Sequence, residues 1–480
     1  MRPADTTGAA GAGPPGAERF KEVKGMKKRI VGTLMALLLA VTVLPLGAIS
    51  VTSADVTTGL VTTAYAEEHK NHCICGAEHK SIGDHTQDAT PETWTGVSSL
   101  SEIQEDGYYY LTKDVELSSA WSANYRHNGG TGYDNNVVLC LNGHSIGQSR
   151  SDAVISVSRG CTITITDCAA EGKQGEIKHV EDKVNDNKIH FNHGVYVTYG
   201  TFNMYGGRIT GNTSGYVDSS NSPVAGEGGG VYVGDGYSSS SNAVFNMYGG
   251  TITGNKADQG GKGGGVYVES GRTFNMYGGT ITGNTANENS IGNSGQGGGV
   301  YVDSGATFNM TGGTIGGTDA AGANKSSSCG GVYVAQNAKF NMANGTISGN
   351  TAVGGGGVYV ERSGDNIDPA VFTMTGGQIT NNTATGTGDN GGGGVYLQSS
   401  QSYTSTLKIS GNPIINSNTR NGSSDNVGLG NSNAKIEVTA ALTEGVQNVL
   451  NSLNGATIAG NSTYYTRTDN GGSVTLTAPT

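Results

Sequence analysis

One line of sequence is written six times in the middle of this chain, and no other feature limits the fold as strongly. The string TFNMYGGTITGNTA at 273–286 recurs almost unchanged as VFNMYGGTITGNKA at 244–257, and looser copies begin at residues 201, 307, 339 and 371. The glycine before each Val-Tyr pair recurs at intervals of 36, 35, 34, 32, 26 and 37 residues, from Gly194 to Gly394. A period of about 20 to 50 residues is typical of solenoids and other repeat arrays.

Each repeat contains three short strand-forming strings, VYV, FNM and TIT, separated by glycine corners. Their β-branched and aromatic residues alternate with period two, which disfavours a helix. Because one repeat can bury its apolar residues only against those of the next, the units must stack. We therefore predict an all-β fold, a right-handed parallel β-helix with three strands per coil and about 4.8 Å between coils. A β-propeller needs about 40 to 45 residues per blade, and the 26-residue unit from Gly331 to Gly357 is too short for one.

Stacking of near-identical coils predicts ladders of identical side chains. In every copy Phe and Ile lie seven residues apart, and alternation along the strands places one apolar set on a single side. In one repeat this set is Val266, Val268, Phe274, Met276 and Ile281. We expect it to form a continuous core. The turn asparagines are expected to hydrogen-bond with their copies in the coils above and below; they are Asn212, Asn255, Asn284, Asn350 and Asn382.

The chain divides into five segments. Residues 1–66 are interpreted as an over-called start followed by a signal peptide from Met26, which ends at an Ala-Tyr-Ala cleavage site before Glu67. A single-pass membrane anchor is the alternative for its apolar run. Residues 67–98 form a Cys/His-rich segment, 99–193 irregular first coils, 194–400 the regular repeats and 401–480 the last coils. We therefore expect a secreted or cell-surface protein with no membrane segment after cleavage.

Composition argues against some classes of partner. The chain carries 28 Lys and Arg residues against 39 Asp and Glu residues, a net charge of -11. This charge repels nucleic acid and anionic lipid, so we expect no nucleic-acid partner. Glycine accounts for 81 of the 480 residues, but without the Gly-X-Y period of collagen.

Several motifs resemble those of exported repeat proteins. GGGVYV and the I-x-x-N-T-A string at 281–286 resemble the GGA[IV] and FxxN tetrapeptides of polymorphic outer-membrane-protein repeats, with Ile281 where those repeats have Phe. The strings KNHCICGAEHKSIGDH, DGYYYLTKDVEL, VVLCLNGHSI and FNMYGGTITGN are similar to the secreted right-handed β-helix repeat proteins of gut-type Gram-positive bacteria, in the pectate-lyase-like superfamily. The resemblance implies an adhesin-like exported or surface protein of a class that usually has no assigned activity.

Catalytic groups are scarce in the repeats. All nine histidines lie at or before His193, and the repeat block has few basic residues, so we expect no catalysis there. The enzymatic alternative is a polysaccharide lyase or glycoside hydrolase of the same fold. It would use Glu269 and Asp303, which follow VYV on adjacent coils about 4.8 Å apart, near the separation of about 5 to 5.5 Å in retaining glycosidases. A solvated turn position is the other interpretation of these two acids.

Thiols and imidazoles cluster just after the expected cleavage site. They supply enough ligands for one tetrahedral zinc ion, and the residues are His72, Cys73, Cys75, His79 and His85. The C-x-C spacing differs from the usual C-x₂₋₄-C, so a linker or a redox segment is the alternative. Zinc is the one cofactor that the sequence suggests.

Two further cysteines, Cys140 and Cys168, lie on or beside strands of the irregular first coils. Buried thiols are one interpretation. Because the two residues are expected on neighbouring coils, a disulfide between them is the other.

An aromatic column is expected along the VYV strands. Tyr occupies the centre of this string in seven coils, from Tyr196 to Tyr396, and alternation directs it away from the core. Aromatic faces suit stacking on sugar rings, so we predict a face that binds carbohydrate or a host surface through Tyr232, Tyr267, Tyr301, Tyr333 and Tyr359. Self-stacking that stiffens the sheet is the alternative. These features favour a non-catalytic extracellular binding or adhesion protein whose many weak contacts add through multivalency.

Overall fold

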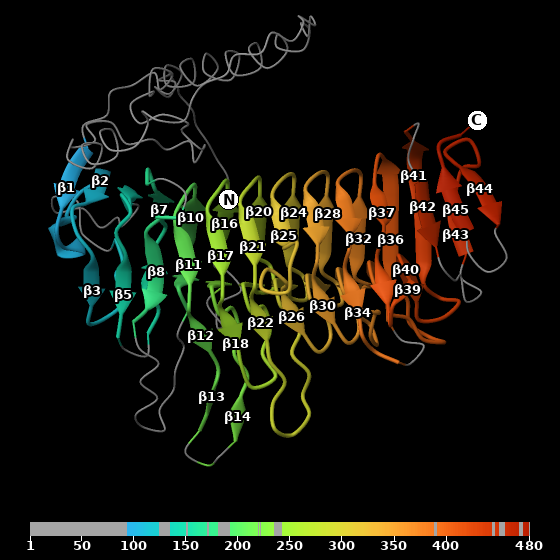
Figure 1. Cartoon of the computed structure of the whole chain (residues 1–480), viewed down its shortest axis with the longest axis horizontal. Helices are drawn as coiled ribbons and strands as arrows, with labels where there is room; N and C mark the ends of the chain where they lie inside the picture. Colours follow the sequence, from blue (N-terminus) through green and yellow to red (C-terminus); the bar gives the residue numbers. More distant parts are fainter. Residues whose placement is uncertain are drawn as a thin grey trace, which may run out of the picture. The chain divides into compact units, whose positions relative to one another are not determined.

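The computed structural model describes residues 94–479 except 124–134, 150–151, 170–171, 181–192, 219, 221, 235–241, 388–390, 444–446, 451–456 and 470–473. These residues form strands and one short 3₁₀-helix, η1 (Leu100–Glu102). The strands stack coil upon coil in chain order, starting from β1 (Trp94–Val97) (Figure 1). The predicted all-β fold, a right-handed parallel β-helix, is confirmed.

The FNM strings and their equivalents build the longest sheet, named here the FNM sheet. Its 13 strands pair in parallel and in register, so that Phe245 pairs with Phe274 and Asn246 with Asn275. After β1 the strands are β2 (Gly107–Leu111), β4 (Asn136–Cys140), β7 (Cys161–Thr166), β10 (Gly200–Met204), β16 (Val244–Met247), β20 (Thr273–Met276), β24 (Thr307–Met310), β28 (Lys339–Met342), β32 (Val371–Met374), β36 (Thr406–Gly411), β41 (Lys435–Leu442) and β43 (Thr457–Gly460).

The second wall, the TIT sheet, has ten strands and keeps the same register, with Ile252 paired to Ile281. Its strands are β3 (Val115–Leu117), β5 (Ile146–Gln148), β8 (Glu176–His179), β11 (Arg208–Thr210), β17 (Thr251–Thr253), β21 (Thr280–Thr282), β25 (Thr314–Gly316), β29 (Thr346–Ser348), β33 (Gln378–Thr380) and β37 (Ile414–Asn416).

The third wall, the VYV sheet, has nine strands and pairs Tyr232 with Tyr267. Its strands are β6 (Ile155–Val157), β9 (Val195–Val197), β15 (Val231–Val233), β19 (Val266–Val268), β23 (Val300–Val302), β27 (Val332–Val334), β31 (Val358–Val360), β35 (Val395–Leu397) and β40 (Val427–Leu429).

A fourth, narrower sheet runs along the corner after the ladder asparagines, where the sequence suggested only a turn. Its strands are two residues long because the Thr-Ala pair, as at Thr285 and Ala286, bonds to the next coil before the chain turns again. The strands of this TA sheet are β12 (Thr213–Ser214), β18 (Lys256–Ala257), β22 (Thr285–Ala286), β26 (Lys325–Ser326), β30 (Thr351–Ala352), β34 (Thr383–Ala384), β38 (Thr419–Arg420) and β39 (Ser423–Ser424).

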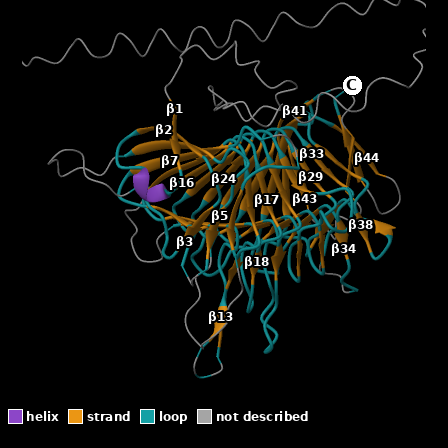
Figure 2. Ribbon diagram, turned by 60° about the vertical axis from the view of Figure 1, so that its left-hand side comes forward, coloured by secondary structure: helices purple, strands orange, loops and turns teal. Residues whose placement is uncertain are grey.

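Two small antiparallel sheets accompany the coils. One is the hairpin of β13 (Tyr216–Val217) and β14 (Pro223–Val224), which projects from the edge where β12 and β18 lie (Figures 1 and 2). The other joins β42 (Gln447–Leu450), β44 (Thr466–Asp469) and β45 (Val474–Thr477). Insertions therefore leave the coil at corners and do not interrupt the walls.

The apolar side of all three walls meets in one continuous core. Val266, Val268, Phe274, Met276 and Ile281, the set expected from one repeat, are all completely buried. The phenylalanines stack along the axis, and the successive ring centroids from Phe245 to Phe372 lie 4.7 Å apart.

The predicted asparagine ladder is confirmed and is longer than expected. Each buried side chain donates from Nδ2 to Oδ1 of the asparagine in the next coil, as Asn255 does to Asn284 at 3.0 Å. Asn324 and Asn418 also belong to this ladder, in coils where the sequence pattern did not select them. The amides thus satisfy one another inside the stack, where an unpaired polar group would be costly.

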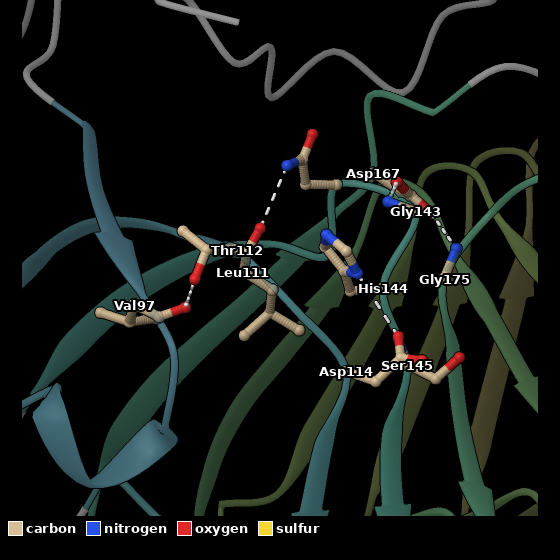
Figure 3. Close-up of polar contacts among 10 residues, drawn as sticks. Val97, Leu111, Thr112, Asp114, Gly143, His144, Ser145, Asp167 and Gly175 are labelled. Atoms are coloured by element: carbon tan, nitrogen blue, oxygen red, sulfur yellow. Dashed lines mark hydrogen bonds and ion pairs between the residues drawn. The ribbon is translucent and has the colours of Figure 1, made fainter. Parts of the chain in front are cut away.

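The irregular first coils precede these ladders, and carboxylates fix their turns. The Asp167 side chain accepts hydrogen bonds from the backbone N–H groups of Gly143 at 2.9 Å and Gly175 at 2.5 Å (Figure 3). Asp114 accepts one from the backbone of Ser145 at 2.9 Å (Figure 3). A few local contacts therefore tie these turns together, in place of a repeated ladder.

Candidate functional site

The tyrosines of the VYV sheet form the predicted column on the side of the strands that faces away from the core. Successive ring centroids from Tyr196 to Tyr396 lie 4.8 to 5.5 Å apart. In the central pairs, from Tyr267 to Tyr359, the ring planes differ by only 6°, 14° and 9°. The column is therefore a nearly continuous aromatic stack.

Four of the five predicted binding tyrosines are buried. Only 6% of Tyr232, 4% of Tyr267 and of Tyr301, and 3% of Tyr333 remain exposed, whereas Tyr359 is half-buried. The rings form a second hydrophobic cluster beside the main core. The expected solvent-facing aromatic surface is wrong for the middle of the column, because these rings stack on one another and offer no open face to a sugar.

One backbone position supplies part of the cover of the column. The residue four positions before each VYV string, named here the cover position, is Glu227, Lys262 or Gln296 in three successive coils, and these three are joined by backbone bridges. Its side chain reaches the rings, since Nζ of Lys262 lies 5.2 Å from the centre of the Tyr301 ring. In the next three coils the cover position holds Ser328, Gly354 and Gly391. The cover therefore thins toward Tyr359.

The two acids of the enzymatic alternative lie beside the covered part of this column. Asp303 accepts a hydrogen bond from the Tyr267 hydroxyl at 3.0 Å, and Glu269 accepts one from the Tyr232 hydroxyl at 3.4 Å. Glu269 also lies 3.5 Å from the guanidinium of the buried Arg272. Both carboxylates are thus engaged by neighbouring side chains, and neither lines the pocket described below.

Two further acids that sequence reasoning did not select flank the same column. Burial raises the pKa of the Glu227 carboxyl, and the positive charge of Lys262 opposes this effect. Burial likewise raises the pKa of Glu361, against a hydrogen bond from the backbone of Gln336. The carboxylates along this column therefore differ in environment.

A pocket of about 460 Å³ lies beside the half-buried Tyr359, and the buried Tyr396 also lines it. Its volume lies within the range of about 300 to 1,000 Å³ that is typical of small-ligand sites. A Cβ atom at Gly354 would lie 3.6 Å from the Tyr359 ring, so the missing side chain there leaves part of the ring open. The polar lining comes from Arg362, Gln398, Ser327, Ser328 and Ser399.

The pocket combines the groups that recognise a polar ring compound. Arg362 presents only donors, whereas the amide of Gln398 and the serine hydroxyls both donate and accept. Tyr359 adds an aromatic surface on the wall. Of the five predicted binding tyrosines, Tyr359 alone lines this pocket. The signal in the sequence was the short segment before VYV in two successive coils, since Ser328 and Gly354 each stand only two residues after a TA strand.

A second aromatic group, which sequence reasoning missed, lies at the corner between the FNM and TIT sheets. Tyr205 stacks on Tyr248 at 4.4 Å, and Tyr248 stacks on Tyr277 at 4.7 Å. Tyr248 is 38% exposed and Tyr277 is 46% exposed. These tyrosines are the Y of the MYGG string, which later copies replace by Thr or Ala. They therefore form a three-ring stack in which Tyr205 is half-buried and the other two rings are exposed, and this stack is shorter than the buried column.

The predicted zinc ligands His72, Cys73, Cys75, His79 and His85 lie outside the described residues, as do the signal peptide and its cleavage site. Within the described part of the chain, no group of three or more His, Cys, Asp or Glu side chains is placed to hold a metal ion. Nor does any described helix combine the length and apolar character required to cross a membrane.

Comparison of the chain with protein-family models, with curated proteins and with solved structures yields no significant match.

A buried histidine, His193, packs against the N-terminal end of the tyrosine column, and its burial predicts that the stability of the protein depends on pH. The centre of the His193 ring lies 5.4 Å from that of Tyr196 and 5.2 Å from that of Tyr232. Burial lowers the pKa of His193 to about 4, although a hydrogen bond with the Gly228 carbonyl opposes this shift. The unfolded pKa is about 6.5, so acidification protonates the unfolded chain first. The contribution of His193 to stability is present above pH 6.5 and is lost as the pH falls toward 4, by about 2 kcal/mol between pH 7 and pH 5.

Urea unfolding of the parent chain and of His193→Phe at these two pH values checks this prediction. The phenylalanine keeps an aromatic ring at the end of the column and removes the titrating group. The variant is expected to lose less stability on acidification, by that amount. An equal loss in both proteins would show that other groups cause the pH dependence.

Proposed function

We propose that this chain is a non-catalytic extracellular binding or adhesion protein that holds a saccharide in the pocket at Tyr359 and Tyr396. The observation that carries the proposal is the coincidence of a half-buried tyrosine, a guanidinium and several hydroxyl and amide groups in one opening of ligand size. The carboxylates of Glu269 and Asp303 already accept hydrogen bonds from the hydroxyls of Tyr232 and Tyr267. Export by the N-terminal signal peptide would bring this pocket outside the cell.

The rigidity of the coil supports a binding role. Tyr359 stacks on Tyr333 at 4.8 Å and lies against Tyr396 at 5.2 Å, so its ring is held in place before any ligand arrives. A preorganised site avoids the entropy cost of ordering its side chains on binding. Adhesion through one pocket per chain would gain strength when many copies are displayed on a surface.

Replacing Arg362 with alanine is expected to weaken glycan binding about tenfold or more, because a hydrogen bond to a charged group contributes about 1.5 to 3 kcal/mol. Ser328→Gln introduces at the cover position the glutamine that the preceding coil carries as Gln296. Its longer side chain should block the pocket. Lys339→Ala, at an exposed lysine on β28 outside the pocket lining, removes the same charge and should bind normally. A glycan array followed by titration calorimetry on the best ligand measures all three.

A reducing-end assay on the same preparations tests the enzymatic alternative. We expect no release of new chain ends. Turnover that disappears in Glu269→Gln or Asp303→Asn would replace the proposal with a hydrolase or lyase. Glycan binding that survives both Arg362→Ala and Ser328→Gln would instead place the ligand elsewhere, and the exposed stack of Tyr205, Tyr248 and Tyr277 would be the next surface to test.

A further inference from the structure

Two cysteine thiols meet beside the FNM sheet in the irregular first coils. Cys140 is the last residue of β4, and Cys168 follows β7, the strand that pairs with β4. Their Sγ atoms lie 3.4 Å apart, although the residues are 28 positions apart in the chain. Both are present as thiols, and Cys140 is buried whereas Cys168 is half-buried.

The strand geometry places this contact away from the core. Leu139 and Leu141, on either side of Cys140, both belong to the main hydrophobic core. Successive side chains of a strand point to opposite faces, so Cys140 points outward, toward the turn that carries Cys168. A bond between the two sulfurs would therefore leave the packed interior untouched.

We propose that Cys140 and Cys168 form a disulfide when the chain meets a disulfide oxidant, and that this bond locks the first coils of the β-helix. The proposal does not depend on glycan binding. It makes the pair a modification site, with the thiol form that the structure shows as the reduced state. A small-molecule disulfide, such as oxidised glutathione, is the class of oxidant that the reaction needs.

The difference in exposure between the two thiols determines which of them reacts first. The half-buried Cys168 reaches the oxidant first, loses its proton and bonds to one sulfur of the external disulfide, whose other sulfur leaves as a thiol. Cys140 then loses its proton and attacks the Cys168 sulfur, which releases the second external thiol. Burial, and after it the contact with Cys168, raise the pKa of the Cys140 thiol. This is consistent with Cys140 reacting second. Two protein thiols are oxidised to one disulfide, and one external disulfide is reduced to two thiols.

The cysteine pair lies in coils that precede both the phenylalanine stack and the asparagine ladder. The phenylalanine stack begins at Phe202 and the asparagine ladder at Asn212, so the turns before them depend on local contacts such as those of Asp167. That residue immediately precedes Cys168, and its side chain already fixes the turn at Gly143 (Figure 3), three residues after Cys140. A disulfide would add a covalent tie between the same two turns, and would restrict the unfolded chain more than the folded one.

The test uses the full chain with Cys73→Ser and Cys75→Ser, so that the other closely spaced thiols do not contribute. The reduced protein is incubated with oxidised glutathione, remaining thiols are alkylated, and intact mass and non-reducing peptide maps are recorded. We expect the loss of two thiols, one cross-linked peptide joining Cys140 to Cys168, and a thermal unfolding midpoint several degrees higher. Removing Cys161 or Cys329, each buried elsewhere in the coils, should leave the cross-link unchanged.

Several results would overturn the proposal. They are two thiols that stay reduced in excess oxidant, a stable glutathione adduct on Cys168 without ring closure, or a cross-link to a different cysteine. The peptide map is made on a chain in which both Cys140 and Cys168 are intact, so it does not depend on the folding of Cys140→Ser or Cys168→Ser. Those variants serve to show that the rise in unfolding temperature disappears together with the bond.

Discussion

Replacing Asn284 with leucine is expected to lower the free energy of unfolding by on the order of 5 kcal/mol. The Asn284 side chain is completely buried. Its Oδ1 accepts hydrogen bonds from the backbone and the side chain of Asn255, both at 3.0 Å. Its Nδ2 donates to Asn324 Oδ1 at 3.1 Å and to the Ile252 carbonyl at 2.9 Å. Leucine makes none of these bonds, so the Asn255 backbone N–H would lose its partner inside the stack, and the Asn255 side chain, the Asn324 side chain and the Ile252 carbonyl would each lose one bond, at about 1 to 3 kcal/mol for a buried group left unsatisfied.

The same repeat offers a matched control. Asn275 belongs to a second asparagine ladder on the outer side of the FNM sheet, where its Nδ2 donates to Asn246 Oδ1 at 2.9 Å and its Oδ1 accepts from Asn309 at 2.9 Å. Water can replace these partners, because this ladder is only partly buried. Asn275→Ala should cost less than about 1 kcal/mol. Chemical denaturation of both variants measures the difference, and similar losses would show that burial does not decide the value of the ladder.

The register of the walls followed directly from the repeats, because equal spacing between Phe and Ile lets each strand pair with its copy only one way. Where the spacing changed, sequence reasoning failed. Asn324 stands nine residues after Ile315, whereas Asn284 stands three after Ile281, yet both occupy the same ladder. An insertion at the corner carries the chain outward and returns it to the same point, and a count from the preceding strand does not reveal this return.

The tyrosine column shows a different limit. Alternation along VYV correctly separates the tyrosines from the core valines, but it describes one strand and does not say what lies on the outer side. The cover comes from Lys262 and its equivalents, in glycine-rich segments that carry no strand pattern of their own. For the same reason the pocket at Tyr359 was not predicted, although a Ser and a Gly at the cover position marked where it opens.

Positions that carry the same residue in every coil and positions that vary between coils have different roles in this fold. Ladders need the same residue in each coil, since each copy supplies the partner of the next. The cover position is free of this requirement, and it changes from Glu227 to Gly391 along the coils. A β-helix therefore places specificity at the positions where successive coils differ, and the pocket lies at such a difference.

Phe308→Ala is expected to lower the free energy of unfolding by about 3 to 5 kcal/mol, the usual cost of removing a buried aromatic ring from a core. The Phe308 ring is completely buried and lies between those of Phe274 and Phe340, with centroids 4.7 Å away on both sides. Phe372 stacks on Phe340 alone, because the next coil carries Leu407. Phe372→Ala should therefore be milder by about 0.5 to 1.5 kcal/mol, the value of one aromatic pair.

Hydrogen exchange can locate the damage as well as measure it. In a stacked array each unit contacts only its neighbours, so Phe308→Ala should reduce amide protection in β20, β24 and β28 and leave β10 and β36 nearly unchanged. Phe308→Leu refills most of the cavity and should recover most of the protection. Uniform loss of protection across all coils would mean that the β-helix unfolds as one cooperative unit. In that case the stacked rings would stabilise the whole array, and their effect would not be confined to adjacent coils.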